Sequence, residues 1–273
     1  KMDHLLMAFG TRPISVEIYL AKARELSNQN KKPEALQVCK DAIAKYPKYE
    51  RINAIKELQN EILNPSMAVN MPTAMYPGDT LSLQVYHTNL DGFTVHIYKV
   101  SLPGNSPLLS NIQEEKNRKK YASQKLSSQH FSLERPANYL QADTVFSLVT
   151  PQEGTYLVEI VPDKAAATNR VSQLLSVTRL KLLSRALPNK RFEAVVLDGK
   201  SGQPVPDATV KLFTVNKGNT TLSQTVKSNG DGRVELDWNS EFRYIGVEKD
   251  TDKGYALQWV RRGGYLFSDR KSE

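Results

Sequence analysis

The segment Val195-Val-Leu-Asp-Gly-Lys-Ser-Gly-Gln-Pro-Val-Pro-Asp-Ala-Thr-Val-Lys-Leu-Phe213 carries the pattern that decides the fold. Two apolar runs flank a connector rich in Gly, Pro and Asp, which is typical of antiparallel strands joined by a tight turn. Lys227-Ser-Asn-Gly-Asp-Gly-Arg-Val-Glu-Leu236 follows as a further turn and strand. We therefore predict a small antiparallel β-sandwich in this part of the chain.

Strand-like stretches recur on both sides of this segment. Residues 80–87 alternate apolar and polar side chains, as a half-buried strand does, and similar stretches continue to residue 177. A second series begins near Leu180, without a long linker. The polar stretch 102–126 is expected to be a long loop or a short surface helix. The fold class is therefore mainly β, with two tandem antiparallel sandwich domains at 65–177 and 178–273.

Residues 1–64 are expected to form a helical lead-in. Ile14, Ile18, Ala21 and Leu26 recur at helical spacing in the first helix, Ala35, Val38, Ala42 and Ile43 line one face of the second, and Ile52, Ile55, Leu58 and Ile62 point inward from the third. The second helix and Pro47 resemble one tetratricopeptide unit. A single unit cannot build a superhelical groove, so we expect a helical cap or connector.

Composition narrows the classes of function. The chain has 273 residues, 40% of them hydrophobic, and a net charge of +8. Basic and acidic residues are interleaved, and no aromatic-basic motif accompanies the charge, so a nucleic-acid partner is not expected. Cys39 is the single cysteine, which excludes an internal disulfide and a thiolate metal cluster. The sequence begins with Lys1, so we expect a part of a longer protein, with any membrane anchor outside this chain.

Candidate chemistry is sparse. His87 and His96 lie on consecutive predicted strands and could approach each other as a cross-strand pair, but their spacing matches no zinc pattern. The run 229–232, Asn-Gly-Asp-Gly, is rich in oxygen ligands yet lacks the EF-hand spacing, so turn chemistry is the favoured interpretation. We predict no catalytic, cofactor-binding or metal-binding residue, no cofactor, and no enzymatic activity.

Aromatic residues gather in the second predicted sandwich. Trp238, Trp259 and Tyr265 are the candidates for an interaction surface. If they are exposed, they favour a sugar-binding platform; if they are buried, they belong to the core. Packing is the favoured interpretation, with Trp259 as a residue that could face a neighbouring domain.

With this layout, the chain resembles the N-terminal region of bacterial alpha-2-macroglobulin-like proteins, particularly the envelope proteins of the Bacteroides group. The resemblance rests on Tyr76-Pro-Gly-Asp79, on Gly154-Thr-Tyr-Leu-Val158, and on Ser201-Gly-Gln-Pro-Val205 followed by Asn229-Gly-Asp-Gly232. These turn-and-strand signatures are shared with fibronectin-like modules. The order of the elements adds more than any single motif.

The resemblance implies a periplasmic or outer-membrane-associated protein that traps or inhibits proteases. This chain would be a non-catalytic structural and interaction segment, with proteases or other domains of the same protein as partners. The family's Cys-Gly-Glu-Gln thioester signature is not present, because Cys39 is followed by Lys-Asp-Ala. The alternative is a glycan- or protein-binding module of a surface polysaccharide-uptake system.

Overall fold

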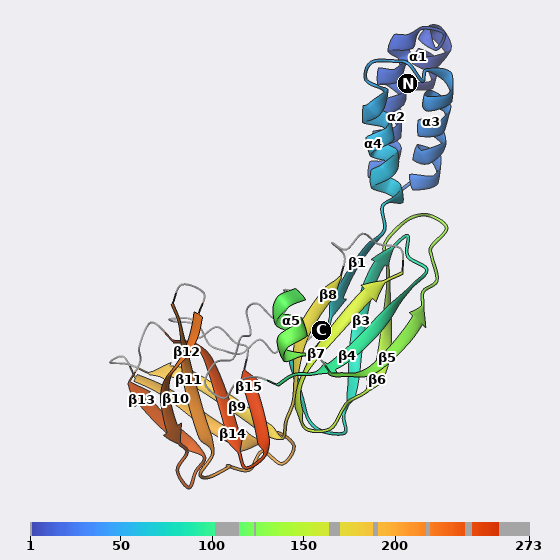
Figure 1. The fold of residues 1–273 in the computed structure, drawn as a ribbon. Coiled ribbons are helices and arrows are strands. Elements are labelled where there is room, and N and C mark those ends of the chain that lie inside the picture. The colour runs from blue at the N-terminus through green and yellow to red at the C-terminus, as the bar shows by residue number, and fades with distance from the viewer. Residues whose placement is uncertain are drawn as a thin grey trace.

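The protein is described by a computed structural model that covers residues 2–101, 115–122, 124–163, 170–187, 191–216, 219–237 and 242–256. A helical unit lies at one end, a first β-sandwich follows it, and a second β-sandwich lies beside the far end of the first (Figure 1). None of the helices in these ranges is long and apolar enough to span a bilayer. The helices and strands within each unit follow from the placement of its apolar residues.

The helical unit contains α1 (Met2–Phe9), a 3₁₀ turn (Pro13–Ser15), α2 (Val16–Asn28), α3 (Lys32–Lys45) and α4 (Ile52–Leu63). The inward face predicted for α4 is confirmed, because all four of its predicted residues are buried. The predicted resemblance of α3 to a tetratricopeptide unit stays a prediction.

The face predicted for the first helix is wrong in part, whereas the four residues predicted to line one face of the second are all buried or packed against the core. In α2 the buried residues are Val16, Leu20 and Ala23, whereas Ile14 is 58% exposed. The reason is that the 3₁₀ turn precedes Val16, so the buried face follows the i, i+4, i+7 positions counted from Val16. In α3, Leu36 and Cys39 join the predicted alanines in the core.

The first sandwich consists of two sheets. One has the order β1-β3-β6, with β1 (Ser66–Asn70), β3 (Thr80–Thr88) and β6 (Ala142–Val149). The other has the order β2-β8-β7-β4-β5, with β2 (Ala74–Met75), β8 (Val171–Val177), β7 (Gly154–Pro162), β4 (Gly92–Lys99) and β5 (Gln124–Ser132). Their facing apolar residues form one core. The pairs are antiparallel except β2–β8, which is parallel.

The second sandwich also has two sheets. One has the order β13-β10-β9, with β13 (Arg233–Asp237), β10 (Arg191–Asp198) and β9 (Leu180–Leu187). The other has the order β12-β11-β14-β15, with β12 (Asn219–Lys227), β11 (Thr209–Asn216), β14 (Phe242–Lys249) and β15 (Asp252–Ala256). Phe192, Val196, Val210 and Leu212 are among the buried residues between them.

The segment 195–213 forms the two expected strands, but they do not pair with each other as a hairpin. Strand β10 pairs with β9 and β13, and β11 pairs with β12 and β14, so the connector crosses from one sheet to the other. Pro204 and Pro206 lie in this connector, and proline has no N–H to extend a ladder. The connector keeps only one isolated bridge, between Leu197 and Pro204.

The polar stretch 102–126 contains a short helix, one of the two predicted alternatives, and the start of a strand that was not predicted there. A short helix, α5 (Glu115–Tyr121), lies on the five-stranded sheet, and β5 begins at Gln124. Tyr98 and Tyr121 pack on a small buried cluster beneath it, which explains how so polar a helix is held. Residues 102–114 lie outside the described ranges.

Candidate functional site

The predicted aromatic surface cannot be placed in the structure. Trp238, Trp259 and Tyr265 all lie outside the described residues. The candidate site is therefore built from the part of the chain that the structure describes. A cavity lies elsewhere, where the two sandwiches meet.

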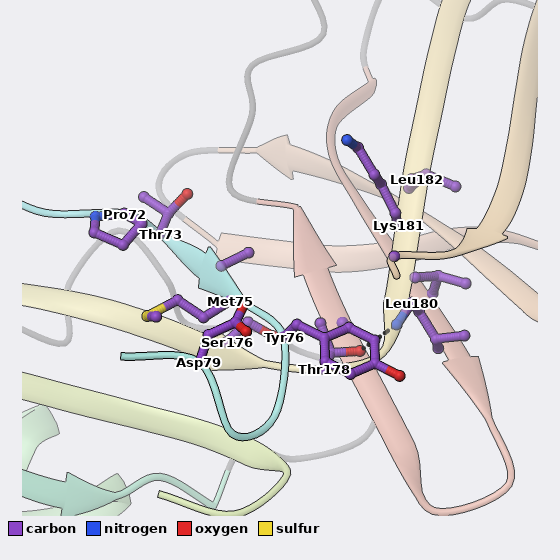
Figure 2. A pocket seen from close by; sticks show the side chains of 14 residues that line it. Pro72, Thr73, Met75, Tyr76, Asp79, Ser176, Thr178, Leu180, Lys181 and Leu182 are labelled. Carbon is purple, nitrogen blue, oxygen red and sulfur yellow. Dashed lines mark hydrogen bonds between the residues drawn. The ribbon is translucent and has the colours of Figure 1, made fainter. Parts of the chain in front are cut away.

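A cavity of about 500 Å³ lies at the seam between the sandwiches. Figure 2 shows Met75 and Tyr76 of the first sandwich on one side and Leu180 and Leu182 of the second on the other. Val247 of β14 also contributes to the wall. Asp79, Ser176, Thr178 and Lys181 also line it, so the wall combines apolar and polar side chains.

The passage from β8 to β9 fixes the two sandwiches against each other. Thr178 donates its backbone N–H to the Met75 carbonyl at 2.9 Å, and its hydroxyl accepts the Leu180 N–H at 3.0 Å. The next residue, Arg179, donates its backbone N–H to the Asp252 carboxylate at 2.9 Å. Two consecutive residues therefore bond to opposite sides of the seam.

Strand β15 packs directly against this passage. Asp252 is 9% exposed, and its Oδ1 has no hydrogen-bond partner within the described residues. A Cβ added at Gly254 would lie 3.2 Å from Thr178 Cγ2 and 3.3 Å from Val247 Cγ1. Arg179 also forms an ion pair with Glu153 at 2.6 Å. Strand β15 is therefore closely packed against Thr178, although Gly254 and Val247 also line the cavity.

The junction between the helical unit and the first sandwich is built around Asn89. Its side chain is buried, and Nδ2 donates to the carbonyls of Ile62 at 2.8 Å and Asn64 at 3.4 Å. These carbonyls lie at the end of α4, where intrahelical partners are lacking. Arg135 donates to the Asn89 carbonyl at 3.0 Å. Nothing in the sequence signals that Asn89 caps a helix distant from it in the chain.

The two histidines that could have approached each other across strands do not lie in one sheet. His87 lies on β3 and His96 on β4, and the short turn between them crosses from one sheet to the other. His96 Nδ1 lies 3.0 Å from the Ser128 hydroxyl instead. Burial lowers the pKa of both histidines. Among the described residues, no group of three or more His, Cys, Asp or Glu side chains could hold a metal ion.

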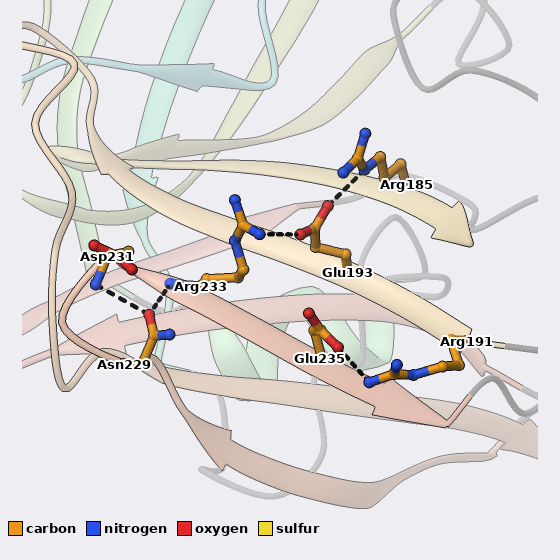
Figure 3. Close-up of polar contacts among 7 residues, drawn as sticks. All are labelled: Arg185, Arg191, Glu193, Asn229, Asp231, Arg233 and Glu235. Atoms are coloured by element: carbon orange, nitrogen blue, oxygen red, sulfur yellow. Dashed lines mark hydrogen bonds and ion pairs between the residues drawn. The ribbon is translucent and has the colours of Figure 1, made fainter. Parts of the chain in front are cut away.

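The Asn-Gly-Asp-Gly run is a turn, as the favoured interpretation predicted. Asn229 Oδ1 accepts the backbone N–H groups of Asp231 at 3.0 Å and Arg233 at 2.9 Å (Figure 3). Gly232 has φ +69°, a conformation that favours glycine. The carboxylate of Asp198 likewise accepts the N–H of Ser201 at 2.8 Å. These side-chain oxygens are occupied by backbone donors.

Charged side chains line the outer face of the β13-β10-β9 sheet, which sequence analysis did not anticipate. Glu193 is 4% exposed and accepts from Arg185 at 2.5 Å and from Arg233 at 3.1 Å, one arginine from each neighbouring strand (Figure 3). Arg191 pairs with Glu235 beside them. The arginines are at least half exposed, so these pairs contribute modestly to stability. The cross-strand register became visible only with the fold.

Solved structures with a similar fold are known. A fragment of native alpha-2-macroglobulin from Escherichia coli spanning domains MG0-NIE-MG1 matches 72% of this chain, with a TM-score of 0.58 and 18% identity. The chain shares the fold of bacterial alpha-2-macroglobulin domains. The resemblance predicted from the sequence is therefore confirmed at the level of the fold.

A second alpha-2-macroglobulin fragment from Escherichia coli spans domains NIE-MG1. The match covers 70% of this chain and 95% of that fragment, with a TM-score of 0.52 and 17% identity. The match to the MG0-NIE-MG1 fragment covers 64% of that fragment. No protein-family model and no curated protein sequence matches the chain.

Proposed function

We propose that this chain is a non-catalytic structural segment of an envelope alpha-2-macroglobulin-like protein, which the whole protein uses in trapping proteases. It would comprise the helical lead-in (1–64) and two macroglobulin-like sandwiches (65–177 and 178–273). Its role would be to hold these units at fixed angles, so that distal parts of the protein are correctly spaced. Its contacts would be with proteases or with other domains of the same protein.

The observation that carries this proposal is the seam at Thr178 and Arg179. A flexible linker would leave the backbone polar groups of both residues to water. Here Thr178 bonds to Met75 and Arg179 bonds to Asp252, so the connection is tied to both sandwiches. A side chain added at Gly254 would also contact Thr178 and Val247. Such a joint supports a spacer better than a mobile binding module.

The trapping role is tested in the longer protein. The protein is mixed with trypsin, and the trypsin that elutes with it is measured by size-exclusion chromatography with a small chromogenic substrate. Gly254→Val, which crowds the seam, should lower capture, whereas Gly230→Ala, where an added Cβ meets nothing within 4 Å, should leave it unchanged. If the unmodified protein captures no trypsin or other endopeptidase, the trapping role is contradicted.

The non-catalytic role is tested with the purified chain. We expect no turnover of peptide or glycoside substrates. Turnover that persists after repurification and is lost on unfolding would contradict it. For the glycan-binding alternative, no described residue provides support, because its aromatic candidates lie outside the described ranges.

A further inference from the structure

His87 is a buried histidine near the junction between the helical unit and the first sandwich. It continues the alternation of buried residues on β3, after Leu81, Leu83 and Val85. The residue is 1% exposed, and its Nδ1 has no hydrogen-bond partner within the described residues. A neutral imidazole is tolerated in such a place, whereas a second proton would put an unpaired positive charge into an apolar core.

His87 lies in the last row that all three strands of the β1-β3-β6 sheet share. Met67 of β1 and Ala142 of β6 lie opposite it on either side. Only the pair of Ser66 and Thr88 lies beyond this row. Figure 1 shows the helical unit beyond the end of the sandwich at which β1 begins. The row of His87 therefore closes the sheet on the side of the junction.

Each of the three strands connects this row to the helical unit. Strand β1 begins only two residues after α4 ends. Asn89, two residues after His87, donates to the carbonyls at the end of α4. Tyr139, three residues before Ala142, packs against the helical core and accepts a hydrogen bond from Lys32 at its carbonyl, at 3.2 Å. An opening of this row would therefore loosen the contacts that hold the helical unit.

Among the described residues, no carboxylate is placed to pair with a protonated His87. Strand β1 has no charged residue. Asp143 of β6 lies opposite Tyr86, so it is on the outer face of the sheet. Lys32 is a cation and half-buried, and the other charged groups at this end of the sandwich are exposed: Glu61, Asp91, His130, Glu134, Arg135 and Asp163. Burial is the cause that lowers the pKa of His87.

We infer that His87 is an acid-sensitive switch at the junction between the helical unit and the first sandwich. While the ring is neutral, it stays in the core and the junction is closed. Once the ring is protonated, it must reach water, so the end of β3 separates from its neighbours and Asn89 leaves the end of α4. This inference goes beyond the proposed spacer role and does not depend on it.

Proton binding makes acid favour the open state. An open, solvated His87 has its ordinary pKa of 6.5, whereas burial lowers the pKa of the ring in the closed state. The open state therefore binds more protons, and the junction loses stability as the pH falls below 6.5. Each pH unit below this value multiplies the opening equilibrium by up to about ten, so about pH 5 favours opening by up to about 30-fold.

Hydrogen exchange of the purified chain tests this inference. Protection factors of amides in the last turn of α4 and in β3 are compared at about pH 7.5 and about pH 5. In the wild-type chain they should fall at least about tenfold at the lower pH, while those of β11 in the second sandwich stay within about twofold. His87→Leu, which takes up no proton, should keep its protection factors within about twofold at both positions.

His130→Gln is the matched control, because His130 is the other histidine at this end of the sandwich. It is exposed and pairs with Asp163 at 2.9 Å, so its replacement should leave the acid response as in the wild type. His87→Gln is a second variant that keeps a polar side chain and takes up no proton, and it should lose the response as His87→Leu does.

The NMR signals of the His87 ring provide a readout that needs no substitution. The ring should become protonated only together with the loss of protection at the end of α4. Wild-type protection that is the same at both pH values would overturn the inference. It would also be overturned if both His87 variants kept the acid response, or if the ring titrated near pH 6.5 while the junction stayed closed.

Discussion

Gly232 occupies a position in the turn before β13 that a larger residue cannot take. Its φ is +69°, and an added Cβ would lie 2.4 Å from the Val196 carbonyl oxygen. Gly202 has a similar φ of +71° with nothing within 4 Å, and Gly230 has neither constraint. These three glycines separate the cost of backbone conformation from the cost of steric contact.

We predict that Gly232→Ala lowers the free energy of unfolding by at least about 2 kcal/mol, because strain and a backbone clash add. Gly202→Ala should cost about 1 kcal/mol, from its backbone conformation alone. Gly230→Ala should change it by less than about 0.5 kcal/mol. Urea unfolding of the three variants measures these losses in the free energy of unfolding and ranks them. Equal effects at Gly232 and Gly230 would contradict the turn described here.

The side chain of Asn89 should stabilise the junction with the helical unit. Asn89 has φ +56°, so Asn89→Gly removes the amide without adding backbone strain. We expect a loss of about 1–3 kcal/mol, because the carbonyls of Ile62 and Asn64 lose a buried donor. Asn89→Asp should cost more, since a carboxylate cannot donate to them. Amide hydrogen exchange should then speed up at the end of α4; unchanged exchange would argue against the cap.

Cys39 links burial in the helical unit to pH. Burial raises the pKa of its thiol from 9.0 to about 11. Between these values the unfolded chain loses the thiol proton while the folded chain keeps it, so the thiol contributes a loss of stability as pH rises through this range. The difference in the pH dependence of stability between wild type and Cys39→Ala isolates the thiol, because the other groups titrate in both proteins. Wild type should lose more stability between about pH 8 and about pH 10.5; parallel pH profiles would contradict a buried thiol.

At the scale of elements, α5 is held on the five-stranded sheet by a buried carboxylate. Glu159 of β7 is 2% exposed and accepts from Arg118 of α5 at 2.5 Å and from Arg170 at 3.2 Å. Lys119, one residue along, pairs with Glu115 of the same helix at 2.8 Å, its one ion pair among the described residues, and both side chains are exposed. Arg118 and Lys119 therefore have very different roles, although they are neighbours on α5.

We predict that Arg118→Met releases α5 from the sheet. Removing one partner of a buried ion pair costs about 3–5 kcal/mol, and the cost here should be smaller because Arg170 remains. Hydrogen exchange within residues 115–122 should accelerate at least tenfold. Lys119→Met is the matched control and should leave exchange nearly unchanged. Similar exchange in the two variants would show that the ion pair does not hold the helix.

Sequence patterns predicted most elements but few of their partners. The alternation in β3 and the apolar face of α4 were readable, because burial repeats at a fixed period along one element. Pairing was not readable: the turns after Thr88 and Asp198 look like hairpin turns, yet each crosses between sheets. The polar strand β5 showed no alternation of apolar and polar residues in the sequence. In the structure its first seven residues, before Phe131, are all exposed.

The candidate site was less predictable than the fold for the same reason. The seam cavity, the Asn89 cap and the Glu193 pairs each depend on residues that are distant in sequence and that only the sheet order brings together. Local patterns did predict the turn chemistry of Asn229, because an Asx turn involves neighbours in the chain. Long-range polar contacts have no such local signature.

Across the whole molecule, we expect the two sandwiches to be held as one rigid unit by the seam between them. The seam rests on Asp252, which accepts the Arg179 N–H, and on the close contact of Gly254 with Thr178. If either contact is lost, the sandwiches should sample several relative orientations, while each keeps its own core.

Pulsed electron–electron double resonance between spin labels at Ser82 on β3 and Thr225 on β12 tests this claim most directly. Both positions are exposed, and Cys39 is replaced by alanine so that only these sites are labelled. We predict one narrow distance distribution for the otherwise unmodified chain, and a broadened one when Asp252→Ala or Gly254→Val is added. A broad distribution in the unmodified chain, insensitive to both substitutions, would contradict it.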